Sequence, residues 1–451
     1  MKKHTQSPYE SSKVSYKPSG IEWLGEIPKH WEICKLNKIS YFINGYAFES
    51  SHFDYSFSIP VIRIGDIQND KIIYHTCLMT KEQENLKNFM IYRGDIVIAL
   101  SGATTGKFAV CNSNKKAYIN QRVAIIRSDI KILKYYLSTF GFVNYIDMLC
   151  NGSAQPNIST KEVGNFKIPL PPLQEQKEIA EFLDSKCEKI QNYIDKKQKL
   201  ITLLQEKKQA LINEVVTKGL NPNIEFKNSE IEYLGLIPHH WEVVKVKYIA
   251  TTNIGLVYDP SEIATNENVG YPVLRANNIQ NGKIDYKDVI YVAKKIDDKQ
   301  LAISGDLLMC VRNGSENLLG KTAKIENNNF SFGAFTAIIR SDLNNYLYWI
   351  FQTEMLKKSI SSFIVSIGIG QISQDDIKNF KIPLPPLQEQ KEIAEFLDKK
   401  CEKINSAIEK TKKQIELVKE YKNTLINEAV CGRVACSRDF SPTAQNDKKK
   451  N

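Results

Sequence analysis

The sequence predicts an α+β protein in which two β-rich domains are separated by two long helices that form an antiparallel coiled coil, a pseudo-two-fold internal duplication. Two repeats predict this fold. Segment 165–190, NFKIPLPPLQEQKEIAEFLDSKCEKI, returns as 379–404 with one difference, Ser185 against Lys399. A shorter echo opens each half, IEWLGEIPKHWE at 21–32 and IEYLGLIPHHWE at 231–242, whereas the residues between the echoes hardly agree. Internal repeats of this kind outrank local sequence signals.

Each long repeat predicts an unusually long helix. It starts after a proline pair, Pro171–Pro172 or Pro385–Pro386, which suits the residues just ahead of a helix. No Gly or Pro then appears before Gly219 in the first copy and Gly432 in the second. At 1.5 Å per residue each helix is roughly 65–70 Å long, far more than a globular helix needs.

The apolar spacing in these segments alternates steps of four and three, which is the heptad pattern of a coiled coil. Matching polar interruptions, Lys197 with Thr411 and Lys208 with Lys422, favour a fixed register. Connectivity makes the pair antiparallel and places the two β-rich domains at opposite ends of a rod. The alternative is two separate helices, each lying on its own domain. The seam residues that we expect to form the coiled coil and to support partner binding are Leu183, Ile190, Ile194, Ile201 and Leu204 in the first helix and Leu397, Ile404, Ile408, Ile415 and Val418 in the second.

The repeats divide the chain into six parts. Runs of β-branched residues bounded by Gly, Asn and Asp predict short strands in both inserts. Trp31 and Trp241, each following an Ile-Pro step, are interpreted as packed structural corners. The predicted parts are an N-terminal tail (1–15), β-rich domain 1 (16–165), helical region 1, which spaces the two β-rich domains (166–222), β-rich domain 2 (223–379), helical region 2 (380–436) and a disordered tail (437–451).

Composition narrows the class of protein. The chain has 42% hydrophobic and 25% charged residues, no apolar run near membrane-span length and no secretory signal, so we expect a cytoplasmic protein. Nine cysteines without CxxC pairs and six histidines without ligand spacing predict no metal site. The net charge of +10 and pI near 8.9 suit a polyanionic partner, although many proteins without a nucleic-acid role carry as much.

Motifs for catalysis are missing. The segment 102–108 and the segment 314–322 resemble phosphate loops, but the first has three residues between its glycines and the second five, where a P-loop needs four. No HExxH, GxSxG, GxGxxG or NPPF-like methyl-transfer motif appears. We therefore expect no catalytic centre on this chain.

Polar loops in the inserts are candidates for DNA contact. Asn and Gln side chains pair with adenine edges and Arg with guanine, while small hydroxyls and Lys suit phosphates. The alternative is that these are ordinary solvated loops. The candidates are Ser101, Thr104, Thr105, Lys107, Asn120, Gln121 and Arg122 in the first insert and Arg312, Asn313, Ser315, Asn317, Lys321 and Thr322 in the second.

The repeated IPLPPLQEQKEIAEFLD segment and the IEWLGEIPKHWE opening resemble the conserved regions of specificity subunits of type I restriction-modification systems. The resemblance covers residues 16–434 and is weakest in the inserts. It implies that each insert reads one half of a bipartite DNA target and that the helices set the unread spacer and dock two modification subunits. Those subunits bind S-adenosylmethionine and methylate adenine at N6. Restriction subunits add ATP- and Mg²⁺-dependent cleavage, so no cofactor is expected on this chain.

Two rival functions remain open. A duplicated coiled-coil scaffold without DNA binding explains the helices, but a scaffold that holds two copies of one partner would keep both inserts alike. A nuclease or fused methyltransferase would require motifs that the sequence lacks. The junctions before the two repeats also differ, because Gln155–Ile158 is not matched letter for letter by Gly370–Ile372.

Overall fold

The computed structural model describes residues 15–152, 155–265, 268–313, 318–363 and 370–434, so the predicted disordered tail lies outside the described residues. The chain divides into two compact units. Unit 1 comprises residues 1–196 and 414–451, and unit 2 comprises residues 197–413. Each unit combines one β-rich insert with parts of both long helices, and each is described by itself.

Unit 1 is built around a four-stranded antiparallel sheet of order β10-β9-β12-β4. A second sheet, β11-β5-β8, contains one parallel pair. The strands are β1 (Tyr16–Pro18), β2 (Glu26–Pro28), β3 (Glu32–Lys35), β4 (Tyr41–Asn44), β5 (Ile59–Ile62), β6 (Ile67–Gln68), β7 (Lys71–Ile72), β8 (Leu78–Thr80), β9 (Ile96–Ala99), β10 (Phe108–Val110), β11 (Tyr118–Ile119), β12 (Val123–Arg127) and β13 (Lys167–Leu170). The helices are α1 (Leu133–Leu137), α2 (Phe140–Cys150), α3 (Thr160–Gly164) and the first part of α4 (Leu173–Lys218).

Unit 2 repeats this arrangement on a sequence with few shared letters. The order β17-β27-β23-β25 in its six-stranded sheet corresponds to β4-β12-β9-β10, and β19 pairs with β26 in parallel as β5 pairs with β11. The strands are β14 (Phe226–Asn228), β15 (Leu236–Pro238), β16 (Glu242–Lys245), β17 (Thr251–Ile254), β18 (Ile263–Ala264), β19 (Tyr271–Leu274), β20 (Ile279–Gln280), β21 (Lys283–Ile284), β22 (Ile290–Val292), β23 (Leu307–Cys310), β24 (Arg312–Asn313), β25 (Thr322–Lys324), β26 (Ser331–Phe332), β27 (Thr336–Arg340), β28 (Gly370–Gln371) and β29 (Lys381–Leu384). The helices are α5 (Asn344–Phe351), α6 (Glu354–Phe363), α7 (Gln374–Asn379) and α8 (Leu387–Val430), whose last part belongs to unit 1.

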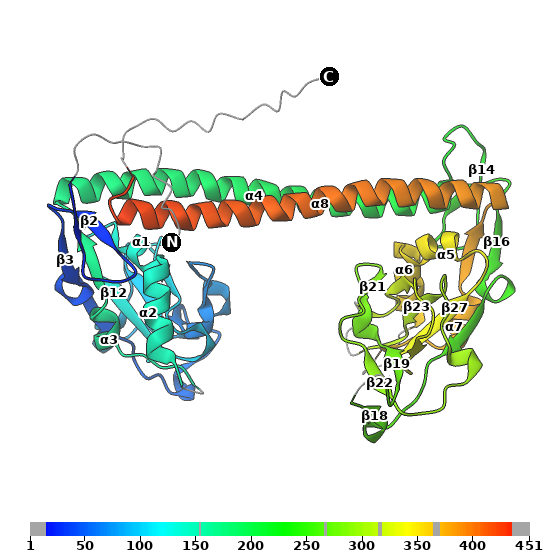
Figure 1. Ribbon diagram of the computed structural model, residues 1–451, viewed down its shortest axis with the longest axis horizontal. Helices are drawn as coiled ribbons and strands as arrows, with labels where there is room; N and C mark the ends of the chain where they lie inside the picture. The colour runs from blue at the N-terminus through cyan, green and yellow to red at the C-terminus, as the bar shows by residue number, and fades with distance from the viewer. Residues whose placement is uncertain (1–14, 153–154, 266–267, 314–317, 364–369, 435–451) are drawn as a thin grey trace. The chain divides into compact units, whose positions relative to one another are not determined.

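The central sheet of unit 1 is buried on both faces, which explains why its strands are continuous apolar runs. Ile96 and Ile98 of β9 pack with α1 and α2 in one cluster, whereas Val97 and Ala99 point into another. Figure 1 shows α2 lying across the sheet. In unit 2 the side chains of β23 also alternate between two buried clusters. The predicted internal duplication of a β-rich insert is therefore confirmed.

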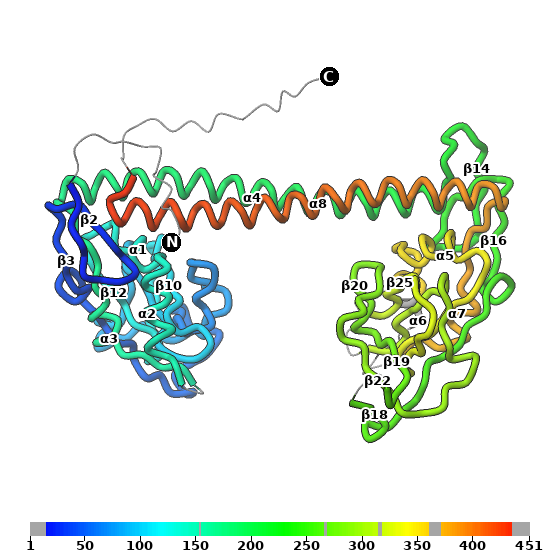
Figure 2. The backbone as a smooth tube through the Cα atoms, viewed as in Figure 1, coloured from blue at the N-terminus to red at the C-terminus, as the bar shows by residue number. Residues whose placement is uncertain are grey.

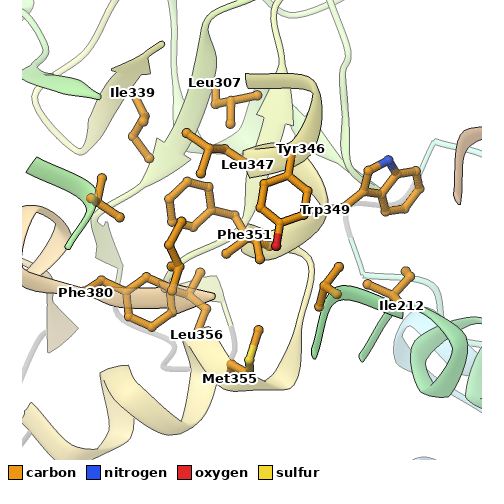
Figure 3. Packing of buried hydrophobic residues seen from close by; sticks show 14 of the residues in the cluster. Ile212, Leu307, Ile339, Tyr346, Leu347, Trp349, Phe351, Met355, Leu356 and Phe380 are labelled. Carbon is orange, nitrogen blue, oxygen red and sulfur yellow. The ribbon is translucent and has the colours of Figure 1, made fainter. Parts of the chain in front are cut away.

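The core of unit 2 joins the insert to the long helices. Leu307 and Ile339 from the sheet share one buried cluster with Trp349 of α5, Phe380 beside β29 and Ile212 of α4 (Figure 3). Because one cluster contains residues of the sheet, the connecting strand and the helix, the helix is fixed to the domain by packing.

The repeated IPLPP segment forms the connection between insert and helix in both units. β13 pairs with β3 and β29 pairs with β16, both antiparallel and in the same register. Tyr136 and Tyr346, both buried, donate their hydroxyls to the Pro169 and Pro383 carbonyls. Burial raises the pKa of both tyrosines well above its usual value, so both hydroxyls stay protonated.

The long helices end as the sequence predicts. α4 begins at Leu173 and ends at Lys218, directly before Gly219, while α8 begins at Leu387 and ends at Val430. Gly219 and Gly432 have φ of +77° and +71°, the left-handed conformation that commonly closes a helix. A Cβ atom on Gly432 would lie 2.6 Å from Pro28 Cγ, so this glycine also permits close packing against the insert.

The heptad seam is confirmed residue by residue. Every predicted seam position in α4 and α8 is buried or half-buried, whereas most positions between them are exposed. The polar interruptions of the seam fit this burial pattern. Thr411 is buried, and its hydroxyl donates a hydrogen bond to the Ala407 carbonyl at 2.7 Å. Lys208 is half-buried. Amphipathic helices with a strict 4-3 spacing thus face each other.

The helix pair is antiparallel in each unit. In unit 1 Leu183, near the start of α4, shares a cluster with Val430, at the end of α8. In unit 2 Val216, at the end of α4, shares a cluster with Ile393, near the start of α8. The two helices run side by side in both units (Figure 2). The alternative of helices that lie separately on their own domains is therefore wrong.

Candidate DNA interface

Three chain segments of unit 1 meet at the end of β9. Leu100 donates its N–H to the Arg122 carbonyl at 2.9 Å and accepts from Ile158 N–H at 2.8 Å, and Gly102 N–H donates to the Pro156 carbonyl. These backbone bonds hold the loop after β9, the turn before β12 and the segment after α2 together. All seven first-insert candidates sit in the first two of these segments, and the Lys107 carbonyl closes the loop by accepting from Ala99 N–H.

The hydroxyl candidates of this loop are turned inward. Thr105 donates to the Gly102 carbonyl at 2.7 Å, while the Ser101 and Thr104 oxygens are buried without a hydrogen-bond partner among the described residues. Buried hydroxyls without partners are uncommon in folded proteins. These three side chains therefore shape the loop, and Lys107, which is exposed, is the group on it that a ligand reaches directly.

The turn Asn120–Arg122 separates a structural residue from two outward ones. Asn120 Oδ1 accepts from Arg122 N–H at 3.3 Å, and Asn120 N–H donates to the Ile62 carbonyl. Gln121 and Arg122 are exposed. An exposed amide and guanidinium on a hydrogen-bonded turn have the geometry that base-edge contacts need.

In unit 2 the candidates divide in the same way. Arg312 is exposed, and its guanidinium lies 5.3 Å from the centre of the Phe335 ring. Asn313 continues β24, which pairs with β28. Thr322 is buried and donates to the Gly320 carbonyl at 2.9 Å, so its hydroxyl is used within the fold, and Lys321 is half-buried. Ser315 and Asn317 lie outside the described residues.

Backbone hydrogen bonds identify equivalent positions in the two units. Val311 donates to the Phe335 carbonyl at 2.9 Å and accepts from Ile372 N–H at 2.8 Å, as Leu100 does with Arg122 and Ile158. Arg312 therefore occupies the place of Ser101, and Phe335 the place of Arg122. Ile158 and Ile372, in the segments that precede the two repeats, therefore occupy equivalent positions. This corrects the mismatch expected from the sequences of these segments.

Sequence reasoning missed Phe335, whose side chain is 56% exposed. An exposed phenylalanine cannot be told from a core residue by composition, since the surrounding stretch reads as an apolar strand. Aligning the segment before β27 with Asn120–Arg122 would have identified Phe335. The two segments share too few identical residues for that alignment to be found from sequence.

Each unit also has a groove between its insert and the helix pair. The groove of unit 1 has a volume of 760 Å³ and is lined by Lys107, Lys134 and Lys422 together with two aspartates. The groove of unit 2 has a volume of 580 Å³ and a stronger positive charge. Its lining includes four lysines and one glutamate: Lys208, Lys283, Lys321, Lys412 and Glu409.

Side chains from the insert fix the helices beside these grooves. Tyr135 and Lys134 both bond to Asp184 Oδ1 at 2.6 Å, and in unit 2 Trp349 Nε1 donates to the equivalent Asp398 at 3.0 Å. Burial, followed by the bond to Asp184, raises the pKa of Tyr135. Burial also raises the pKa of Asp398, although the Trp349 bond opposes that rise.

Two other arginines are structural. Arg127 holds Asp95 with Nε at 2.8 Å and Nη2 at 2.7 Å, and Arg340 holds Asp306 at 2.9 and 2.7 Å. Both carboxylates are at most 5% exposed. Because a bidentate pair with a buried carboxylate is costly to break, these guanidiniums are not available to a ligand.

The chain matches the sequence model of the type I restriction modification DNA specificity domain twice, over residues 28–205 and 238–417, and therefore belongs to that family. It is a specificity subunit with two DNA-recognition domains, a class without catalytic activity in which catalysis sits in partner subunits. Among the described residues, no group of three or more His, Cys, Asp or Glu side chains could hold a metal ion. Nor is any helix in the described ranges long and apolar enough to cross a membrane.

Relatives support the assignment along the chain. The MjaVIII specificity subunit of Methanocaldococcus jannaschii is 28% identical over 77% of this chain and 81% of its own length. The MjaX subunit of the same organism, described as a putative specificity subunit, is 27% identical over 91% and 95%. A chain of a solved type I restriction-modification system covers 90% of this chain and 99% of its own, with 17% identity and a TM-score of 0.69, which shows a shared fold.

Proposed function

We propose that each insert reads one half of a bipartite DNA target, with residues 16–165 and 223–379 as target recognition domains 1 and 2 and 166–222 and 380–436 as helical regions. One observation carries this proposal: the two inserts keep the same backbone hydrogen bonds at the candidate loops but differ in the side chains that face outward, such as Arg122 against Phe335. A shared scaffold with different outward groups suits reading two different sequences.

In this proposal the exposed side chains contact bases and the lysines contact phosphates. Gln121, Arg122 and Arg312 are the base-reading candidates, and Lys107 and Lys321 contact the phosphate backbone of the DNA. Asn120, Asn313 and the inward hydroxyls of Ser101, Thr104, Thr105 and Thr322 shape the loops. Ser315 and Asn317 remain candidates as in the sequence analysis.

The long helices set the length of the unread spacer and dock two modification subunits, which bind S-adenosylmethionine and methylate adenine at N6. Restriction subunits, with ATP and Mg²⁺, complete the cytoplasmic complex. Exposed apolar residues on the long helices support docking, because α4 and α8 use their seams for each other. Beyond Leu173 and Leu387 at the helix starts, they are Tyr193, Leu200, Leu203, Leu417 and Tyr421, each 39–59% exposed.

A methylome tests the function. The chain is expressed with its modification subunit in a host without adenine methylation, and N6-methyladenine is mapped by single-molecule sequencing. The expected result is a new bipartite motif with a fixed gap. No new motif from soluble, co-purifying proteins contradicts the proposal.

The alternative is a duplicated scaffold that does not bind DNA. DNA recognition through phosphate contacts requires binding that weakens steeply with salt, by a slope of about 0.9 per neutralised phosphate. Binding of the purified complex to duplex DNA between low and physiological salt separates the two. A scaffold gives no binding or a flat salt dependence.

A further inference from the structure

The two units differ at one buried acidic position. In unit 1 Asp66, which is 2% exposed, accepts from Arg63 N–H at 2.9 Å and from Arg63 Nε at 3.2 Å. In unit 2 the equivalent arginine is Arg275, whose N–H donates to Asn278 Oδ1 at 2.8 Å. An amide, 1% exposed, thus stands where unit 1 has a carboxylate.

The guanidinium of Arg275 consequently keeps its charge unneutralised. Its Nη2 donates to the Asp288 carbonyl at 3.2 Å, as Arg63 Nη2 does to the Thr76 carbonyl at 2.8 Å. Its Nε is buried with no hydrogen-bond partner, and no carboxylate lies within 4 Å of it among the residues that the structure describes. A guanidinium left without an anion is a group that attracts a hydrogen-bond acceptor.

This arginine lines a cavity whose other walls are mostly small or apolar, with Asn277 and Thr336 as polar members. The cavity has a volume of 510 Å³. Leu256, Tyr258, Ala276, Ala334 and Phe335 form much of the wall. The Arg312 guanidinium lies over the Phe335 ring, so the cavity is next to a candidate base-reading residue.

We propose that this cavity receives the major-groove edge of a thymine in the half-site read by unit 2. The proposal rests on the proposed function and names the base that this part of the interface selects. Thymine is the base that presents a methyl group beside a carbonyl acceptor, O4, in the major groove. The apolar wall around Phe335 contacts the methyl group, and Arg275 donates to O4. Cytosine presents an amino donor in that place, which a donor-only guanidinium repels.

Unit 1 has a different surface in the equivalent place. Its Arg63 is neutralised by Asp66, and Asn120, Gln121 and Arg122 replace Gly333, Ala334 and Phe335. Polar side chains there remove the apolar wall. The inference is therefore specific to unit 2 and predicts no dependence on a thymine methyl at the matching step of the other half-site.

The test uses the full chain assembled with its modification subunits and a duplex carrying the motif from the methylome. Each thymine of both half-sites is replaced singly by deoxyuridine, which removes only the methyl group, and dissociation constants are measured. We expect about a fourfold weakening at one thymine in the half-site of unit 2, the effect of no longer burying one methyl group. Phe335→Ala should abolish that difference between thymine and deoxyuridine. Tyr248→Ala, which removes another exposed aromatic of the same unit, is the matched control and should retain it.

Arg275→Met separates the acceptor contact from the methyl contact. It should weaken binding tenfold or more while the thymine-to-deoxyuridine ratio persists. Equal weakening on all sequences together with a shallower salt dependence would assign Arg275 to a phosphate and overturn the proposal. Specific binding without a deoxyuridine effect at any thymine in that half-site overturns the inference and leaves the proposed function intact. No sequence-specific binding overturns the proposed function itself.

Discussion

The indole of Trp31 donates its N–H to the Glu175 carboxylate at 2.8 Å, and this bond joins the first insert to the first turn of α4. Trp241 and Glu389 repeat the joint in unit 2 at 3.0 Å. Both indoles are at most 1% exposed, and a histidine in each unit shares the carboxylate. Each glutamate thus serves the helix N-terminus and the buried indole at once.

Glu175→Ala should loosen this joint in unit 1. The substitution leaves a buried indole N–H without an acceptor, which destabilises by about 1–3 kcal/mol. Amide hydrogen exchange of the assembled chain should rise in β2, β3 and the start of α4. Glu178→Ala, three residues along the same exposed helix start, is the control and should change exchange little. Equal exchange in both variants contradicts a structural role for the bond.

The seam and the outward face of the helices should respond differently to charge. Ile201 is 4% exposed, so Ile201→Asp buries a carboxylate in the helix pair. The substitution should lower the free energy of unfolding by several kcal/mol and break assembly with the modification subunits. Ile415→Asp should do the same. Leu203→Asp changes a side chain 51% exposed and should abolish co-purification with the modification subunit while the melting temperature stays near that of the parent. Retained co-purification of Leu203→Asp would remove this face from the docking surface.

Periodicity and repetition were sufficient to predict the helices, because each residue of a heptad seam reports directly which side is buried. The starts after the proline pairs, the ends at Gly219 and Gly432 and the antiparallel pairing all follow from local rules. Trp31 and Trp241 as packed corners follow similarly from a repeated aromatic beside a strand.

The site was harder to predict, because a loop residue's role depends on which long-range backbone bonds hold it. Thr322 and Ser101 read as small polar donors, yet their hydroxyls face inward. Phe335 reads as a strand residue, yet it stands where Arg122 stands in unit 1. Equivalence between the inserts is visible only through their hydrogen bonds.

Arg122→Ala and Arg312→Ala should each relax specificity at one base pair, in opposite half-sites. The loss of a bidentate base contact costs about 1–3 kcal/mol against the preferred base and little against the others. Methylome profiling of each variant should show one degenerate position. Lys107→Ala, by contrast, should weaken binding to all sequences alike and make the salt dependence shallower by about one unit of slope. Degeneracy spread over both half-sites from a single arginine change would contradict separate readers.

Two buried cysteines, Cys401 in α8 and Cys431 directly after its end, should report opening of the packing around this helix. Burial raises the pKa of Cys401 and of Cys431 to about 11, so at pH 8 very little of either thiol is in the reactive thiolate form. Raising the pH toward 11 increases the thiolate fraction, and unfolding removes both burial and the shift. Alkylation followed by mass spectrometry should therefore leave both residues unmodified in the folded chain at pH 8 and modify them in denaturant. Modification in the folded chain at pH 8 would show that this packing opens under native conditions.

Lengthening the helices should lengthen the unread spacer and nothing else. One heptad inserted at matching depth, after Lys199 in α4 and before Lys413 in α8, preserves the 4-3 seam and adds about 10 Å at 1.5 Å per residue. Since base pairs are spaced about 3.4 Å apart, the methylome of this variant should show a gap longer by about three base pairs with both half-sites unchanged. A four-residue insertion at the same points breaks the heptad register and serves as the contrast, with loss of assembly expected. A changed half-site in the heptad variant would mean that the helices take part in reading the sequence.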